Sequence, residues 1–305
     1  MKKTSWRSPI LLFLTAVIWG TAFVAQSVGM DYVGGFTFNF VRNIIGGLVL
    51  LPCIFWMKRS RSSADDQTEK STVRQQKSGM DKVLWMGGIC CGAALFVASN
   101  LQQFGIKYTT VGKAGFITAM YIVIVPLMGI FLKRTVGIKV WISVVFSVAG
   151  LYLLCITDGF SLGFGDILVL ICAVCFAGHI LIIDHFSPKT DGVQLSCIQF
   201  FTCGILSGIG MLLFETPDLP SICQAWLPIL YAGAMSSGVG YTLQIIGQKD
   251  MDPTVASLIL SLESVMSVLA GWLILGQSLS MRELCGCVLM FVAIILAQLP
   301  ERKTV

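Results

Sequence analysis

Long stretches without a single charged side chain constrain this chain more than any other feature. No Asp, Glu, Lys or Arg occurs in residues 8–30, 43–57, 83–106, 114–132, 140–157, 167–183, 192–214, 219–248 and 284–300, and Glu263 alone interrupts 253–281. About 20 apolar residues allow a helix to cross the hydrocarbon core of a membrane. Charged residues make up 12% of the chain, against roughly 25% in soluble domains. The sequence therefore predicts a polytopic membrane protein and excludes an ordinary soluble or disordered one.

The apolar stretches predict an all-α fold. A membrane β-barrel shows alternating hydrophobicity in segments of about ten residues, whereas runs such as Ile122–Val125 do not alternate. We expect the segment 58–82, which is charged and rich in Ser and Gln, to be a solvated cytoplasmic loop. We predict ten transmembrane helices, at about 10–29, 37–57, 83–103, 113–132, 138–156, 164–184, 193–214, 226–247, 254–275 and 283–299.

The basic residues predict how the chain is oriented. With ten crossings both termini lie on one side, and the 21 Lys and Arg residues then gather on that side, except Lys107, Lys113, Arg282 and the intramembrane Arg42. Cytoplasmic segments of membrane proteins carry such an excess of basic residues. We therefore expect a multi-pass protein of the plasma membrane whose N- and C-termini are both cytoplasmic.

The sequence repeats itself at an offset of 142 residues. The segment 101–107 (LQQFGIK) matches 243–249 (LQIIGQK), and each lies at the end of a third helix within its half. The two halves, 1–157 and 158–305, each hold five predicted helices. Because five is odd, the second half enters the membrane from the opposite side, which gives two inverted five-helix repeats. Many secondary transporters are built in this way and bind substrate near the midplane between the repeats.

Four short runs carry a family resemblance through their order and spacing: 19–23 (WGTAF), 38–42 (FNFVR), 108–118 (YTTVGKAGFIT) and 262–276 (LESVMSVLAGWLILG). Together they resemble the EamA-domain family of the drug/metabolite transporter superfamily, over the whole chain. The resemblance implies a bacterial-type permease that transports, and often exports, small metabolites such as amino acids. The chain departs from the family pattern where Leu132-Lys133 and Gly276-Gln277 replace the common Gly-Glu at two helix ends.

Two charged residues inside predicted helices are candidate site residues. An arginine at the centre of a membrane helix costs about 2.5–3.5 kcal/mol, so Arg42 is either a carboxylate anchor or a side chain that snorkels to the headgroups. A buried, unpaired carboxyl group favours its protonated form. Glu263 is therefore a candidate to bind an amine or to carry a coupling proton, and its alternative role is a structural hydrogen bond. The repeat places Tyr121 at the position equivalent to Glu263.

Polar and aromatic residues at helical spacing suggest which helix faces line a pathway. Tyr241 and Gln244 lie on one face of the eighth helix, with Ser237 and Gln248, and Trp19 lies on a similar face of the first. We predict that Trp19, Arg42, Tyr121, Tyr241, Gln244 and Glu263 bind substrate. His179 in the sixth helix is a second candidate for proton coupling, or else a hydrogen-bonded interior histidine.

Motifs for other chemistry are missing. The chain has no Gly-x-x-x-x-Gly-Lys-Ser/Thr loop, and Cys172 and Cys175 have no second pair at metal-ligand spacing. We expect no cofactor, no metal, no enzyme activity and no nucleic-acid partner. The expected partners are a small-molecule substrate, the lipid bilayer and protons, and the GxxxG spacings at 88–92 and 204–208 suit either helix packing or a homodimer face. A non-transporting scaffold or regulator and an integral membrane enzyme are the alternatives.

Overall fold

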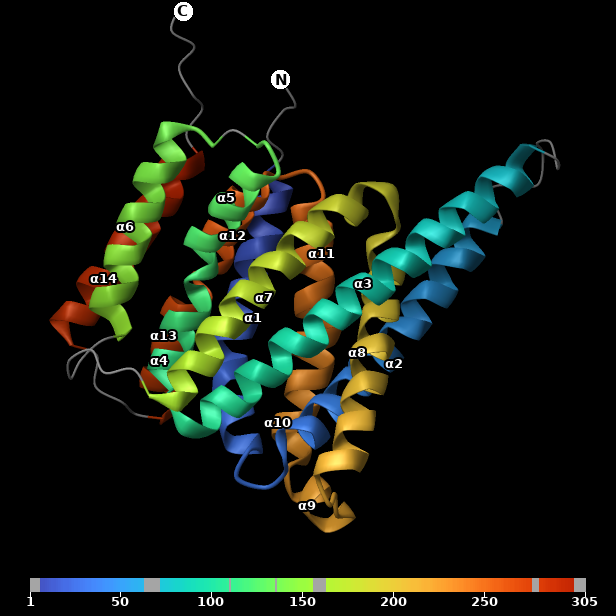
Figure 1. Cartoon of the computed structure of the whole chain (residues 1–305), viewed down its shortest axis with the longest axis horizontal. Helices are drawn as coiled ribbons and strands as arrows, with labels where there is room; N and C mark the ends of the chain where they lie inside the picture. The colour runs from blue at the N-terminus through green and yellow to red at the C-terminus, as the bar shows by residue number, and fades with distance from the viewer. Residues whose placement is uncertain are drawn as a thin grey trace, which may run out of the picture.

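The computed structural model describes residues 6–62, 72–109, 111–134, 136–155, 163–275 and 280–298, and within these ranges it is helical with no strand. Figure 1 shows the helices gathered in one bundle. The α-helices are α1 (Arg7–Gly29), α2 (Gly35–Ser62), α3 (Thr72–Tyr108), α4 (Val111–Ala119), α5 (Tyr121–Phe131), α6 (Ile138–Cys155), α7 (Phe164–Phe186), α8 (Gly192–Phe214), α9 (Leu219–Gln224), α10 (Trp226–Leu230), α11 (Thr242–Gln248), α12 (Pro253–Leu260), α13 (Glu263–Leu275) and α14 (Met281–Gln298). A 3-10 turn, η1 (Ser187–Lys189), follows α7, and a π-helix, η2 (Tyr231–Tyr241), joins α10 to α11.

The ten predicted membrane segments are all present as helical segments. Within the described ranges, 7 segments are long and apolar enough to cross a membrane, and α6 and α14 contain shorter apolar stretches. The remaining segment, 226–248, is divided among α10, η2 and α11. The predicted all-α polytopic fold is confirmed, and three of the ten crossings consist of more than one helix.

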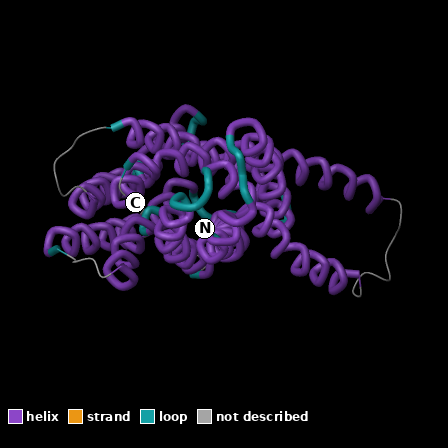
Figure 2. The backbone as a smooth tube through the Cα atoms, turned by 90° about the horizontal axis from the view of Figure 1, so that it is seen from below, coloured by secondary structure: helices purple, strands orange, loops and turns teal. Residues whose placement is uncertain are grey.

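The predicted loop at 58–82 is wrong at both of its ends. Helix α2 continues to Ser62 and α3 begins at Thr72, so that both helices extend as a pair from the bundle (Figures 1 and 2). Lys, Arg, Gln and Met predominate in these extensions and are good helix formers. A helix continues through such residues even where they are too polar for the membrane, so the apolar window underestimates helix length.

Small residues let the helices approach closely. A side chain at Gly88 or Gly92 of α3 would collide with Ile198 or Thr202 of α8. Gly204 and Gly208 of α8 similarly face Ile44 and Phe40 of α2. Both GxxxG pairs are therefore used in packing α2, α3 and α8 within the chain, as small residues commonly are in membrane bundles.

Aspartate residues cap α8 and α12, and both helices begin at the end of the bundle drawn uppermost in Figure 1. Asp191 accepts hydrogen bonds from the backbone N–H groups of Val193 and Gln194, and Asp252 accepts from Thr254. These bonds satisfy donors that a helix leaves unpaired in its first turn. The first turn of α1 and the last turn of α14 lie at the same end of the bundle (Figure 1). The two chain termini themselves, residues 1–5 and 299–305, lie outside the described residues.

Candidate functional site

Two membrane segments are broken at equivalent places in the two repeats. Helix α4 gives way to α5 at Met120, and α12 gives way to α13 at Ser261 and Leu262. The same short backbone bonds occur in both breaks: Met120 N–H donates to Ile117 and Leu262 N–H to Ile259, at 3.2 and 3.1 Å. Each pair is related by the offset of 142 residues that the sequence repeat shows. The breaks therefore belong to the repeated architecture.

A hydrogen bond joins the two breaks. The Tyr121 hydroxyl donates to Glu263 Oε1 at 2.9 Å, and the two residues are 142 positions apart. Tyr121 begins α5 and Glu263 begins α13, so each side chain starts at the N-terminal end of a half-helix, where backbone N–H groups favour negative charge. Nearby, the Ser264 hydroxyl donates to the Gly115 carbonyl at 3.0 Å. The two repeats are thus held together where their broken helices meet.

A central cavity lies beside this hydrogen bond. Its volume is about 30 Å³, room for about two water molecules and less than an amino acid needs. The cavity takes residues from both repeats. They are Trp19, Ala22, Phe23, Gln26, Arg42, Gln102, Thr118, Tyr121, Phe176, Ser236, Tyr241 and Glu263.

Arg42 is a buried cation at the cavity wall. Its side chain is 2% exposed, its guanidinium lies 5.8 Å from the centre of the Phe38 ring, and its Nε has no hydrogen-bond partner. No carboxylate among the described residues forms an ion pair with it. A buried charge of this kind needs a partner to offset its lost hydration.

The helix that carries Arg42 is fixed at its first turn by the second repeat. Glu215, which follows α8, accepts hydrogen bonds from the backbone N–H groups of Phe36 and Thr37 at 2.9 and 2.8 Å, and from the Thr37 hydroxyl at 2.6 Å. A carboxylate at this place satisfies unpaired donors and complements the helix dipole. Glu215 therefore holds the start of α2 in position relative to α8.

Aromatic rings form another wall. The Trp19 and Tyr241 rings lie 4.5 Å apart between centroids at 53°, and Trp19 Nε1 donates to the Ser236 carbonyl at 3.4 Å. Tyr241 also contacts the ring of His179 at 6.0 Å. Ser236 and Tyr241 belong to η2, and π-helical turns occur frequently at functional sites. The wider helix directs both residues to the cavity from one face of the second repeat.

Five of the seven residues predicted for the site line the cavity: Trp19, Arg42, Tyr121, Tyr241 and Glu263. Gln244 is buried elsewhere, with its side-chain carbonyl unpaired. His179 lies behind Tyr241, where its Nε2 is 3.2 Å from Gln199 Oε1 and its Nδ1 has no partner. The structure thus brings the charged and aromatic candidates together and leaves Gln244 and His179 outside the lining.

Other lining residues are not among those predicted to bind substrate. Gln26 and Gln102 are polar residues within apolar runs, and their helical spacing already places them on faces that could line a cavity. Phe176 and Ser236 carry no such signal, because phenylalanine and serine are common in any membrane helix. Only the packing of α7 and the π-helical turn direct them to the cavity.

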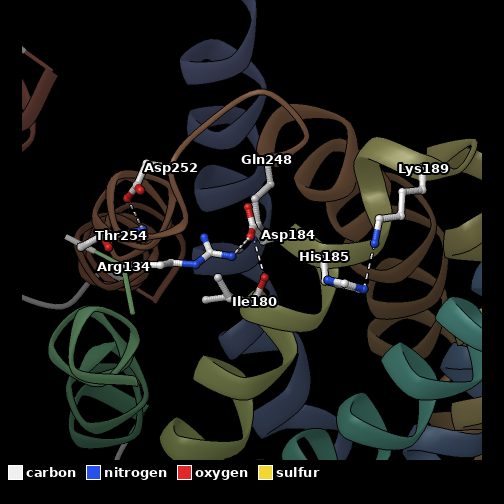
Figure 3. A network of polar contacts seen from close by, with 8 residues as sticks. All are labelled: Arg134, Ile180, Asp184, His185, Lys189, Gln248, Asp252 and Thr254. Atoms are coloured by element: carbon white, nitrogen blue, oxygen red, sulfur yellow. Dashed lines mark hydrogen bonds and ion pairs between the residues drawn. The ribbon is translucent and has the colours of Figure 1, made fainter. Parts of the chain in front are cut away.

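The α4–α5 segment packs along α7, and a polar contact joins the two at each end of this interface. At one end the Arg134 guanidinium donates to Asp184 at 2.5 Å, beside a bond from Gln248 Nε2 to the Ile180 carbonyl at 2.6 Å. Figure 3 shows these two bonds converging on the last turns of α7. At the other end Thr109 donates to Asp166 at 2.5 Å. We call the Arg134–Asp184 pair the Arg134 clasp and the Thr109–Asp166 pair the Asp166 clasp. Each pair joins one repeat to the other.

A helical membrane bundle with equivalent breaks and a buried polar cavity between two repeats has the construction of a membrane transporter. The model of the EamA-like transporter family matches residues 6–156 and 163–299. The chain belongs to the EamA-like transporter family, and it is a multi-pass membrane transporter.

Relatives support this assignment along the whole chain. An uncharacterized transporter of Archaeoglobus fulgidus is 30% identical over 94% of this chain and 84% of that protein. An uncharacterized transporter of Clostridium kluyveri is 23% identical, over 96% of this chain and 94% of its own length. A solved crystal structure with 18% identity superposes with a TM-score of 0.76 and covers 97% of both chains, which shows a shared fold.

Proposed function

We propose that this protein is a secondary transporter, and by resemblance an exporter, of small zwitterionic metabolites, with amino acids as the first candidates. The observation that carries the proposal is that the buried guanidinium of Arg42 and the buried carboxyl group of Glu263 line one cavity from the two repeats. The division into repeats at 1–157 and 158–305, the plasma-membrane location and the cytoplasmic termini belong to the same proposal. A substrate would sit between the repeats, where alternating access requires it.

Arg42 would bind the substrate carboxylate. Its guanidinium is buried and has no ion-pair partner among the described residues, so a carboxylate would supply the missing charge-assisted hydrogen bonds. The aromatic side chains of Trp19 and Tyr241 would pack on the substrate. Substrate entry would then remove the cost of an unpaired buried cation, which favours binding of anions and zwitterions over neutral molecules.

Glu263 would bind the substrate amine or a coupling proton. The Tyr121 hydroxyl occupies one carboxyl oxygen and leaves the other for an ammonium group or a proton. An ammonium group that also displaced Tyr121 would open the bond between the two helix breaks. His179, in ring contact with Tyr241, is a second candidate proton carrier.

Thermal unfolding of the purified protein tests the substrate class. Ligand at 100 times its dissociation constant adds about 2.7 kcal/mol to the free energy of unfolding. We expect stabilisation by amino acids, and much less by the amines that lack the carboxylate. Arg42→Gln should remove that difference, whereas Arg282→Gln, which changes an arginine outside the cavity, should keep it. Equal stabilisation by amines and amino acids in the unmodified protein would contradict the proposal.

Flux into proteoliposomes tests the coupling role. Glu263→Gln should abolish uptake driven by a pH gradient, because the amide cannot take up and release a proton, while the protein remains folded. A matched His179→Gln variant shows whether the histidine contributes. Normal pH-driven flux in Glu263→Gln would exclude Glu263 as the coupling group.

A further inference from the structure

Three polar side chains of the first repeat line the central cavity without a role in the proposed function. They are Gln26 of α1, Gln102 of α3 and Thr118 of α4. Their exposed fractions are 4, 6 and 2%, so none of them is solvated from outside the bundle. A polar group buried in this way costs free energy unless a hydrogen bond replaces its lost water.

The contacts of these residues are incomplete. Gln102 Nε2 donates to the Thr118 hydroxyl at 3.2 Å, which joins α3 to α4. The side-chain oxygen of Gln26 has no partner in the part of the chain that the structure describes. Gln103 Nε2 donates to the Gln26 backbone carbonyl at 3.2 Å and so fixes α1 against α3 at this level. The group is held in place and still lacks a hydrogen-bond partner.

The second repeat offers no equivalent group. At the offset of 142 residues, Gln102 corresponds to Gln244, which does not line the cavity, and Thr118 corresponds to Leu260, which is buried and apolar. The cavity therefore has a polar wall on the first repeat and an aromatic wall of Trp19, Phe176 and Tyr241. Because the two walls differ, the polar part and the apolar part of a bound molecule would face different sides of the cavity.

We propose that Gln26, Gln102 and Thr118 form a subsite that selects substrates bearing an uncharged hydrogen-bonding group, an amide or a hydroxyl. This inference rests on the proposed function, in which Arg42 and Glu263 bind the carboxylate and amine. It narrows the substrate class to zwitterions with a polar, uncharged side chain. An apolar side chain of the same shape leaves the subsite unpaired, and a site built to form hydrogen bonds rejects such analogues strongly.

Isosteric ligands test the subsite on the purified full-length protein. Threonine and valine differ by a hydroxyl in place of a methyl group, and asparagine and leucine have similar shapes with and without an amide. We expect the unmodified protein to bind threonine and asparagine about fivefold or more tightly than their apolar partners, since an unpaired buried group costs about 1–3 kcal/mol. Titration calorimetry in nanodiscs measures the four affinities.

Variants of the subsite show which residue causes the preference for ligands with a polar side chain. Gln102→Leu should remove it while affinity for valine and leucine stays the same or rises, and Gln244→Leu is the matched control at the equivalent place outside the cavity. If Gln102→Leu does not fold, Thr118→Val makes the same test with no change of shape. Binding of all four amino acids without preference would overturn the subsite and leave the zwitterion site standing. Binding of none of them to folded protein would contradict both.

Discussion

Lys133 has the one backbone conformation among the described residues that a non-glycine side chain rarely adopts, with φ at 59°. It follows α5, where Lys133 N–H donates to Ile130 and Arg134 N–H to Gly129, both at 2.9 Å. This is the glycine position of a Schellman motif. Lys133→Gly should raise the free energy of unfolding by about 0.5–1 kcal/mol, because glycine has no side-chain penalty there. Thermal unfolding checks this, and an equal gain in Lys133→Ala would point to the charge instead.

Single residues also show which members of the candidate site could be predicted from the sequence. Arg42 and Glu263 could be picked out as cavity residues because charge within a membrane helix is costly wherever it has no function. Gln244 has a similar signal and is buried outside the cavity. Its equivalent, Gln102, does line the cavity. Helical spacing predicts on which face of its helix a residue lies. Only the packing of neighbouring helices decides whether that face lines the cavity.

Close packing of α1 against the broken α12–α13 segment depends on Gly20. A Cβ at this position would lie 2.7 Å from both the Glu263 carbonyl oxygen and the Ser267 backbone nitrogen. Gly20→Ala must therefore push α1 away from α13, and overpacking of this kind costs about 1–3 kcal/mol. Gly178→Ala in α7 is the matched control, because nothing lies within 4 Å of its added Cβ. The control should gain up to about 1 kcal/mol, and a similar loss in both variants would contradict the argument.

Helix positions followed from the sequence, and helix interruptions did not. The charge-free windows located all ten segments, since the cost of charge in the membrane depends on composition alone. Pro126 is the residue that suggests a kink in the fourth segment, yet the break lies at Met120, outside the proline's own turn. Met120 and Leu262 are ordinary apolar residues. Contacts between the repeats lie beside both breaks, through the Tyr121–Glu263 and Ser264–Gly115 bonds, and the order of apolar residues along the chain does not predict those contacts.

At the scale of the whole molecule, polar bonds join the two repeats at several levels. The Arg134 and Asp166 clasps lie at opposite ends of α7, and the Tyr121–Glu263 bond lies between them. The Arg134 and Asp184 side chains are 38% and 17% exposed, and a pair as open to solvent as this contributes about 0–1 kcal/mol. Such a bond stabilises the fold little, but it can shift a balance between two conformations of similar free energy.

Breaking the Arg134 clasp should therefore open the cavity from that end without unfolding the protein. We expect a cysteine at position 22, in place of the cavity residue Ala22, to react several-fold faster with a maleimide applied from the Arg134 side in Arg134→Asp and in Asp184→Arg. The background would have its native cysteines replaced. The double variant restores opposite charges and should react as slowly as the parent, since a shift of about 1 kcal/mol changes the open population about fivefold. Fast labelling that persists in the double variant would mean that size or packing, and not the ion pair, keeps this end closed.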